Sequence, residues 1–87
     1  MKDKKLISKY SKQELKDLIE QDYKVRNENP HYLIHNDVIS IYSMFDGMLW
    51  EDCYIEPKIF DCTIREAERM FIDNGFKNCI KDLSSTN

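Results

Sequence analysis

Glycine and proline are scarce in this 87-residue chain, which contains two of each. So low a content excludes a collagen-like chain and a chain built of flexible linkers. Long apolar segments are also missing, because no run approaches the ~20 residues that a membrane-spanning helix needs. The basic N-terminus lacks the apolar stretch that follows it in a secretory signal peptide. We therefore expect no membrane segment and a cytoplasmic location.

Cysteine and positive charge are also limited. The three cysteines, Cys53, Cys62 and Cys79, are odd in number and widely spaced, which argues against a disulfide framework and predicts reduced, partly buried thiols. Thirteen basic and sixteen acidic residues give a net charge of −3. Proteins that bind duplex nucleic acid are usually strongly basic. The sequence therefore predicts no direct binding to duplex nucleic acid.

Capping signals and apolar periodicity predict a first helix over residues 12–27. Ser11 and Glu14 have the spacing of a capping box, in which each side chain accepts a hydrogen bond from the backbone of the other residue. Apolar residues then recur at helical spacing. The helix is expected to end before Pro30, because the residue that precedes a proline disfavours the helical conformation.

A second helix is predicted over residues 64–74. Thr63 and Glu66 form another capping box at its start, and Gly75 suits the left-handed position that follows a helix. The apolar residues within 76–83 allow either one more helical turn or a short final strand. Residues 1–10 are expected to be a flexible basic arm and residues 84–87 a polar tail.

The segment between the helices is rich in β-branched and aromatic residues, which favour strands. Asp46 and Gly47 are the strongest short hairpin signal, because both central positions of a type I′ turn need a positive φ. The alternative is one helix over 38–50, which the many poor helix formers disfavour. We expect three strands, over 31–35, 38–45 and 48–56.

The expected fold is a single small α+β domain over residues 1–87. Two helices would flank a small antiparallel sheet in the order α-β-β-β-α. Apolar residues from both helices and from the strands would form the core: Leu15, Leu18, Ile19, Leu33, Ile39, Ile41, Phe45, Ala67, Phe71, Ile72 and Phe76.

Counting outward from a two-residue turn predicts the register of the hairpin. The expected cross-strand pairs are Phe45 with Met48, Ser43 with Trp50, Ile41 with Asp52, and Ile39 with Tyr54. Neither face of such a hairpin is purely polar. Helices would cover one face, and the other would keep apolar groups within reach of a partner.

Charge is distributed unevenly along the chain. Residues 27–57 contain six acidic residues and no Lys or Arg, whereas residues 1–26 carry a net charge of +3. Acidic groups mixed with aromatic side chains suit docking on a basic protein surface. The alternative is a solvated sheet whose carboxylates keep its edges soluble. We predict a partner-binding site made of Trp50, Tyr54, Glu51, Asp52, Tyr42 and Asp46.

These features favour a non-catalytic protein-binding module without a cofactor, whose partner is a protein with a basic surface. The small size, the acidity and a composition typical of AT-rich coding suggest, by analogy, a phage or mobile-element inhibitor of a host protein. In that case the relevant compartment is the cytoplasm of the host cell. Self-association into a homodimer through the same sheet is a close variant.

A second functional hypothesis comes from Asp46 followed by Glu56-Pro57-Lys58. This spacing resembles the motif of the PD-(D/E)xK nucleases, and the order of helix, hairpin and helix is similar to the core of that family. The resemblance implies that the two acids hold Mg²⁺, that Lys58 polarises the attacking water, and that Glu20 acts as an additional acid. Proline stands where that motif has an apolar strand residue. The alternative function is thus a Mg²⁺-dependent nuclease or its inactive descendant.

The histidines and cysteines do not predict a metal site. His31 and His35 would point to the same face of a strand but lie about 13 Å apart, too far for one zinc ion. The cysteines lack the close spacing of zinc motifs. We therefore expect the histidines to lie at the surface or on an edge strand, and the thiols to be buried.

Overall fold

The structure, a computed structural model, describes residues 9–80. The helical elements are α1 (Lys12–Leu18), the π-helical turn η2 (Ile19–Tyr23), α2 (Lys24–Arg26), the 3-10 turn η3 (Pro57–Phe60) and α3 (Ile64–Asp73). The strands are β1 (His31–His35), β2 (Val38–Phe45), β3 (Met48–Ile55) and β4 (Lys77–Asn78). Residues 1–8 of the predicted arm and the predicted tail over 84–87 lie outside the described residues.

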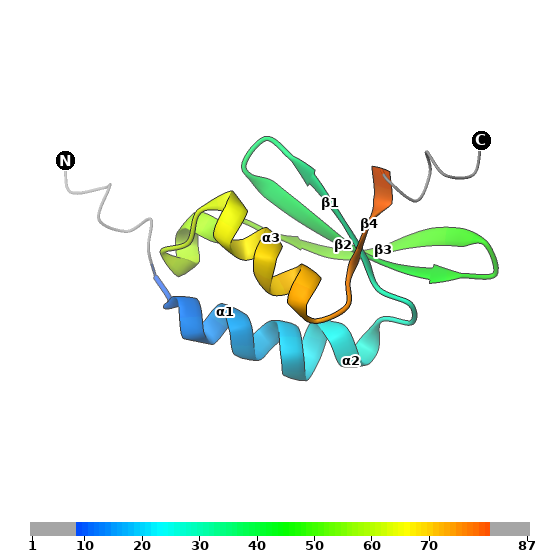
Figure 1. The fold of residues 1–87 in the computed structure, drawn as a ribbon, viewed down its shortest axis with the longest axis horizontal. Helices are drawn as coiled ribbons and strands as arrows, with labels where there is room; N and C mark the ends of the chain where they lie inside the picture. The colour runs from blue at the N-terminus through cyan, green and yellow to red at the C-terminus, as the bar shows by residue number, and fades with distance from the viewer. Residues whose placement is uncertain (1–8, 81–87) are drawn as a thin grey trace.

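The strands form one four-stranded sheet in the order β3-β2-β1-β4. Helices α1 and α3 lie on one side of this sheet, and the β2–β3 hairpin extends past them (Figure 1). Strands β1, β2 and β3 are antiparallel neighbours, whereas β4 runs parallel to β1. The α+β class is therefore confirmed, but the sheet is mixed rather than antiparallel, and a fourth strand follows the last predicted helix.

The fourth strand depends on how α3 ends. Gly75 has a φ of 88°, and Phe76 N–H donates to the carbonyl of Phe71 at 3.0 Å, which is the reversal expected when glycine follows a helix. The chain then passes beside β1, where Lys77 N–H donates to the carbonyl of Pro30 at 3.1 Å. Two strand residues are too few to produce a recognisable alternation in the sequence.

Both predicted helix starts are confirmed. Ser11 and Thr63 each accept a hydrogen bond from the backbone of the glutamate three residues later, and both capping boxes are complete. The first helix ends at Arg26, where the backbone of Asn27 becomes extended. The buried side-chain amide of Asn27 donates to the carbonyl of Tyr23 at 2.8 Å, which satisfies one of the carbonyls that a helix end leaves without a partner.

The predicted turn of the hairpin is confirmed, but the predicted register is wrong beyond the first cross-strand pairs. Asp46 and Gly47 have φ values of 58° and 76°, as a type I′ turn requires. The helix considered over 38–50 is not formed, because β2 and β3 occupy this segment. The pairs of Phe45 with Met48 and of Ser43 with Trp50 are observed, and the register then shifts.

The register shift is a β-bulge that inserts Asp52 into β3. Ile41 pairs with Cys53 instead of Asp52, and Ile39 pairs with Ile55 instead of Tyr54. Because side chains alternate between faces, one inserted residue moves every later residue of β3 to the face opposite the one it would occupy without the bulge. The bulge therefore brings Ile55 into the core and leaves Tyr54 on the face opposite the helices.

The core lies between the sheet and the two helices. Its buried members are Leu15, Ile19, Tyr23, Tyr32, Ile39, Ile41, Ile55, Phe60, Cys62, Ala67, Phe71 and Phe76. The predicted members Phe45 and Ile72 are exposed, and Leu33 is half-buried on the other face of the sheet. Phe45 fails as a core residue because the hairpin reaches past the helices that would have covered it.

Candidate functional site

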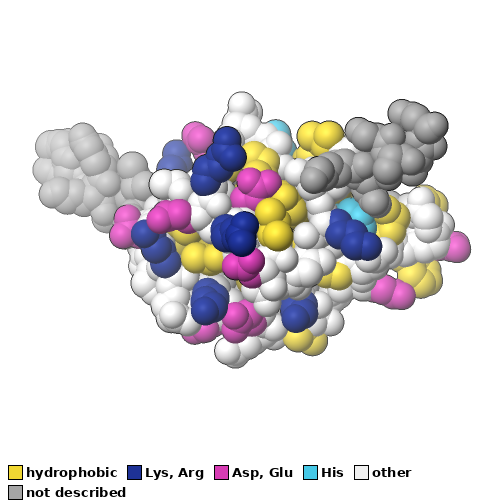
Figure 2. Space-filling view, viewed as in Figure 1, with side chains coloured by type: hydrophobic (Ala, Val, Ile, Leu, Met, Phe, Trp, Pro, Cys, Tyr) yellow, Lys and Arg dark blue, Asp and Glu magenta, His cyan; other side chains and the backbone are white. Residues whose placement is uncertain are grey.

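Three large apolar side chains gather at the end of the β2–β3 hairpin. Phe45, Met48 and Trp50 are 55%, 53% and 54% exposed, respectively. Phe45 lies opposite Met48, and Trp50 is two residues farther along β3, so all three point to the same face of the hairpin. We call Phe45, Met48 and Trp50 the hairpin-end patch. Figure 2 shows hydrophobic side chains interspersed with acidic ones at this end of the molecule, on the right of the view.

Acidic residues lie near the hairpin-end patch. Asp46 is in the turn between Phe45 and Met48, and Glu51 follows Trp50 on β3 with its side chain on the opposite face of the hairpin. Glu28 is held beside β2, because its carbonyl accepts from Met44 N–H at 3.0 Å and its N–H donates to Ser43 Oγ at 3.2 Å. No Lys or Arg occurs between residues 27 and 57. This segment of the chain therefore carries a net negative charge.

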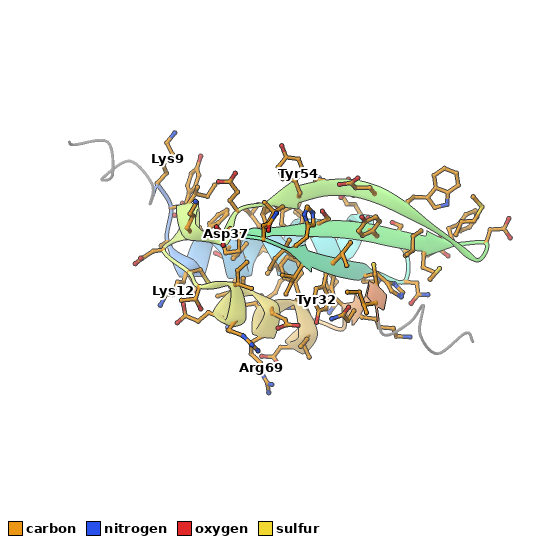
Figure 3. The ribbon with its side chains drawn as sticks, turned by 90° about the horizontal axis from the view of Figure 1, so that it is seen from above. Lys9, Lys12, Tyr32, Asp37, Tyr54 and Arg69 are labelled. Carbon is orange, nitrogen blue, oxygen red and sulfur yellow. The ribbon has the colours of Figure 1, made fainter. Side chains whose placement is uncertain are left out.

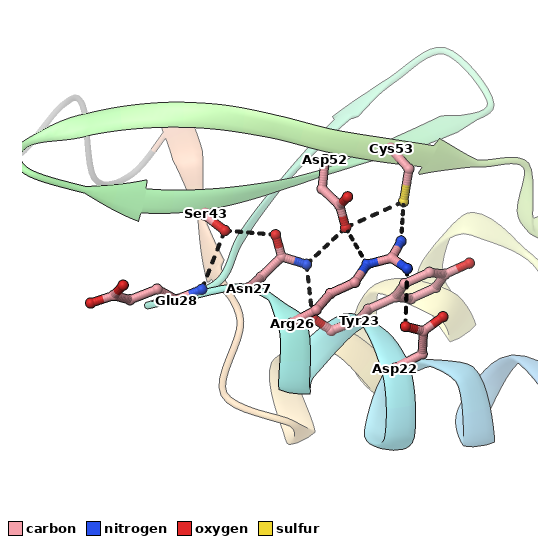
Figure 4. A network of polar contacts seen from close by, with 8 residues as sticks. All are labelled: Asp22, Tyr23, Arg26, Asn27, Glu28, Ser43, Asp52 and Cys53. Atoms are coloured by element: carbon pink, nitrogen blue, oxygen red, sulfur yellow. Dashed lines mark hydrogen bonds and ion pairs between the residues drawn. The ribbon is translucent and has the colours of Figure 1, made fainter.

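A polar network attaches the base of the hairpin to the end of the first helix (Figure 4). Asp52 Oδ2 accepts from Arg26 Nε at 2.8 Å and from Asn27 Nδ2 at 2.9 Å. Ser43 Oγ, on β2, donates to Asn27 Oδ1 at 2.7 Å. Asp22 also pairs with Arg26, at 3.0 Å. Both strands of the hairpin are thus bonded to the same short segment of helix and loop.

The network changes the proton affinity of Asp52. Partial burial raises its pKa, but the hydrogen bonds from Asn27 and Arg26 act in the opposite direction and leave the pKa below its ordinary value. The hydrogen bond to Asp52 in turn raises the pKa of Arg26. Asp52 is therefore a structural carboxylate whose charge is already matched within the chain. Its contacts with Arg26 and Asn27 fix the hairpin to the end of the first helix.

The opposite face of the sheet carries a second group of predicted site residues. Tyr42 and Glu51 are directly paired, and Tyr54 lies farther along β3 on the same face; we call this the open face. In Figure 3, Tyr54 and Tyr32 lie on opposite sides of the sheet, with Tyr32 beside α3. His35 helps to line a shallow hollow of about 420 Å³ here, together with Val38, Ser40, Tyr42, Glu51 and Tyr54.

The structure thus divides the predicted binding site over two faces. Trp50 and Asp46 are at the hairpin end, Tyr42, Glu51 and Tyr54 share the open face, and Asp52 turns toward the helix. Strand alternation alone separates Trp50 from Glu51 and Tyr42. The bulge at Asp52 adds one change, because it moves Tyr54 from the face of Trp50 to the open face.

Sequence reasoning missed two members of the patch. Met48 was not assigned to the site, and Phe45 was placed in the core because it alternates with Ile41 and Ile39. Both residues flank the Asp46-Gly47 turn directly. Proximity to the turn is the signal that could have identified them, since the tip of a hairpin is the part that a short helix covers least.

The residues of the nuclease resemblance are not brought together. Asp46 is in the turn before β3, and Glu56 follows the other end of that strand. A strand of this length separates its ends by about 25 Å, whereas two carboxylates must each lie about 2 Å from a shared Mg²⁺. Glu20 is exposed on η2. Within residues 9–80, no three His, Cys, Asp or Glu side chains are placed so that they could hold a metal ion.

The two histidines have separate environments. His31 is buried, and its Nδ1 lies 2.8 Å from the carbonyl of Asn29. His35 is exposed, with Nε2 3.4 Å from Ser40 Oγ. They lie at opposite ends of β1, as predicted, but the expectation of a surface or edge position is wrong for His31, which is buried on an inner strand of the sheet.

Comparison of the chain with protein-family models, with curated proteins and with solved structures finds no match. In the part of the chain that the structure describes, no helix has the length and apolar character needed to cross a membrane. The side chains themselves therefore provide the basis for a functional interpretation.

Proposed function

We propose that this chain is a non-catalytic protein-binding module that docks through the hairpin-end patch onto a partner with an apolar pocket and a basic rim. The observation that carries the proposal is the exposure of Phe45, Met48 and Trp50 on one face of a projecting hairpin. Burying such a cluster stabilises a complex, whereas leaving it in water is costly for a monomer. Tryptophan is also among the residues that most often dominate binding energy.

The position of the patch supports binding. The network of Arg26, Asn27, Ser43 and Asp52 anchors the base of the hairpin. An anchored hairpin loses less conformational entropy when it binds, which favours affinity. The hairpin also reaches past the helices (Figure 1), so a partner can approach the patch without meeting α1 or α3.

The charge around the patch indicates the chemistry of the partner. Glu28, Asp46 and Glu51 provide negative charge, and no Lys or Arg lies between residues 27 and 57. Lys and Arg on the partner would be attracted by these carboxylates, including Glu51 on the other face of the hairpin, and this attraction would increase the association rate. A second copy of this chain would instead bring like charges together around the two patches, which disfavours a homodimer joined at this surface.

The proposal is tested by quantitative capture. Tagged wild-type chain would be incubated with a lysate, and the proteins retained would be compared with those retained by Trp50→Ala and by Glu51→Lys. Val25→Ala is the matched control, because Val25 is 74% exposed but lies on α2, outside the patch. Binding of the same captured protein should fall at least about tenfold for Trp50→Ala and remain unchanged for Val25→Ala.

Native mass measurement of the captured complex completes the test. A complex with a different protein, weakened by Glu51→Lys and by added salt, supports a basic partner. A homodimer, or capture that is equal for Trp50→Ala and the wild type, would contradict the proposed function.

A further inference from the structure

The sheet has an edge at β3 that no described strand covers. β3 is the outermost strand in the order β3-β2-β1-β4. An edge strand exposes a row of backbone N–H and C=O groups that can pair with another extended chain. Proteins commonly block such edges with lysine or proline, yet β3 contains neither residue.

Among residues 9–80, contacts leave only the first half of this edge open. From Asp52 onward, β3 contains the bulge and is attached to the helix through Arg26 and Asn27. Residues 48–51 precede the bulge and form regular pairs with β2. Met48, Trp50 and Glu51 are exposed in this half, and Leu49 is half-buried.

The backbone groups of Leu49 and Glu51 face outward on this half of the edge. The pair that closes a two-residue hairpin turn is hydrogen-bonded, and hydrogen-bonded pairs then alternate with non-bonded ones. Met48 and Trp50 therefore bond to β2, whereas Leu49 and Glu51 point away from it. Met44, the residue opposite Leu49, follows the same alternation, because its N–H donates away from β3 to the carbonyl of Glu28 at 3.0 Å.

We propose that the partner adds an extended basic segment as a new strand along residues 48–51 of β3. This inference rests on the proposed function and specifies how the partner binds. Neighbouring strands share their faces, so one set of the added side chains would lie beside Trp50 and the other set beside Glu51. The segment that fits therefore alternates apolar residues, which extend the hairpin-end patch, with Lys or Arg, which pair with Glu51.

The charge of β3 disfavours pairing of this edge with the β3 edge of a second copy of the chain. Antiparallel pairing of two such edges would bring both copies of Glu51 into one short seam, and neither copy has Lys or Arg between residues 27 and 57. Like charges across a strand pair are destabilising. The carboxylates that discourage self-pairing thus favour a basic strand.

Hydrogen exchange in the full, isotopically labelled chain tests the inference directly. The probe is a capped hexapeptide of alternating lysine and valine, and the control peptide has glutamate in place of lysine. At a saturating concentration of the lysine peptide, hydrogen exchange of the Leu49 and Glu51 amides should slow by about tenfold or more. The reason is that the added strand would accept hydrogen bonds from these outward N–H groups or shield them from water. The Met48 and Trp50 amides, which already bond to β2, should change less, and the control peptide should have no effect.

Two variants distinguish the contribution of the Leu49 backbone N–H to peptide binding from that of the leucine side chain. Leu49→Pro and Leu49→Ala both remove the leucine side chain, but only proline removes the outward N–H. Proline is tolerated on an edge strand where its nitrogen faces solvent, and circular dichroism would verify the fold. Affinity for the lysine peptide should fall about tenfold in Leu49→Pro relative to Leu49→Ala. If Leu49→Pro does not fold, the exchange measurement on the wild type still decides.

Failure of this inference can be told apart from failure of the proposed function. If the lysine peptide moves the Trp50 indole signal while the Leu49 and Glu51 amides exchange as before, strand addition is wrong and the patch remains a binding surface. Absence of any saturable change with the lysine peptide, or a concentration-dependent dimer in sedimentation, would also overturn strand addition. The proposed function has a separate test, because it fails if Trp50→Ala leaves partner capture intact.

Discussion

The side-chain amide of Asn27 donates a 2.9 Å hydrogen bond to the carboxylate of Asp52 and so joins the end of the first helix to the bulge in β3. The same amide group accepts from Ser43 on β2 at 2.7 Å. One residue therefore contacts both strands of the hairpin that carries the proposed binding patch. The stability of that hairpin and the geometry of the patch are expected to depend on Asn27.

Replacing Asn27 with alanine should lower the free energy of unfolding by about 2 kcal/mol, because it removes the three hydrogen bonds that this buried side chain makes. Gln13→Ala is the control: the amide of Gln13 also bonds a carboxylate, that of Asp17, at 3.0 Å, but on the exposed side of α1. The control should change stability by less than about 0.5 kcal/mol. Equal effects in urea unfolding would show that the Asn27 network does not stabilise the hairpin.

Acid should weaken the fold partly through Asp52. Because its pKa is lower in the folded chain than its ordinary value of 3.8, this carboxylate contributes stability above that value, and the contribution is lost as the pH falls through the folded pKa. The variant Asp52→Asn should be less stable at neutral pH and should lose less stability below about pH 4. Unfolding curves of both proteins from pH 2 to 7 would measure this, and parallel pH profiles would contradict it.

Alkaline pH should act through Tyr32. Burial, followed by the 2.6 Å hydrogen bond from its hydroxyl to Glu68, raises the pKa of Tyr32 to about 12 from an ordinary value of 10.0. The folded pKa is the higher one, so the stabilisation is complete below pH 10 and is lost as the pH rises toward 12. Tyr32→Phe should show a shallower loss of unfolding free energy over this interval. A slope identical to that of the wild type would refute the assignment.

Gly47→Ala should destabilise the hairpin through the backbone alone. A β-carbon at Gly47 would meet no atom within 4 Å, but its φ is 76°, a conformation that costs about 1 kcal/mol for alanine. Gly47→Asn is the matched variant, because asparagine adopts this conformation more readily. Thermal unfolding should rank the wild type above the asparagine variant and the asparagine variant above the alanine variant. An alanine variant as stable as the wild type would contradict the turn assignment.

Much of the fold could be predicted because its signals are local. Ser11 with Glu14, and Thr63 with Glu66, set the helix starts within four residues of sequence, and Asp46-Gly47 determines the turn by its own conformational preference. Such signals act whatever the rest of the chain does, and all three predictions were confirmed.

The rest depended on contacts between distant residues. The bulge at Asp52 is stabilised by Arg26 and Asn27, which lie some 25 residues earlier in the chain, so no pattern near Asp52 reveals it. The same holds for Phe45, whose alternation with Ile41 predicts burial but whose exposure depends on where the helices end. The candidate site was therefore predicted in part. Trp50 and Asp46 lie at the hairpin end, alternation places Tyr42 and Glu51 on the open face, and the bulge moves Tyr54 to that face as well.

Trp50 is the only tryptophan of the chain, and this permits one decisive measurement. The chain would be prepared with 5-fluorotryptophan, whose single fluorine signal reports on Trp50 even in the presence of a partner that contains tryptophan. In the free protein the signal should show the H₂O/D₂O shift of an exposed ring, since Trp50 is 54% exposed. Docking through the hairpin-end patch predicts that this solvent shift disappears when the captured partner is added to saturation; a bound complex in which Trp50 keeps the full solvent shift would contradict it.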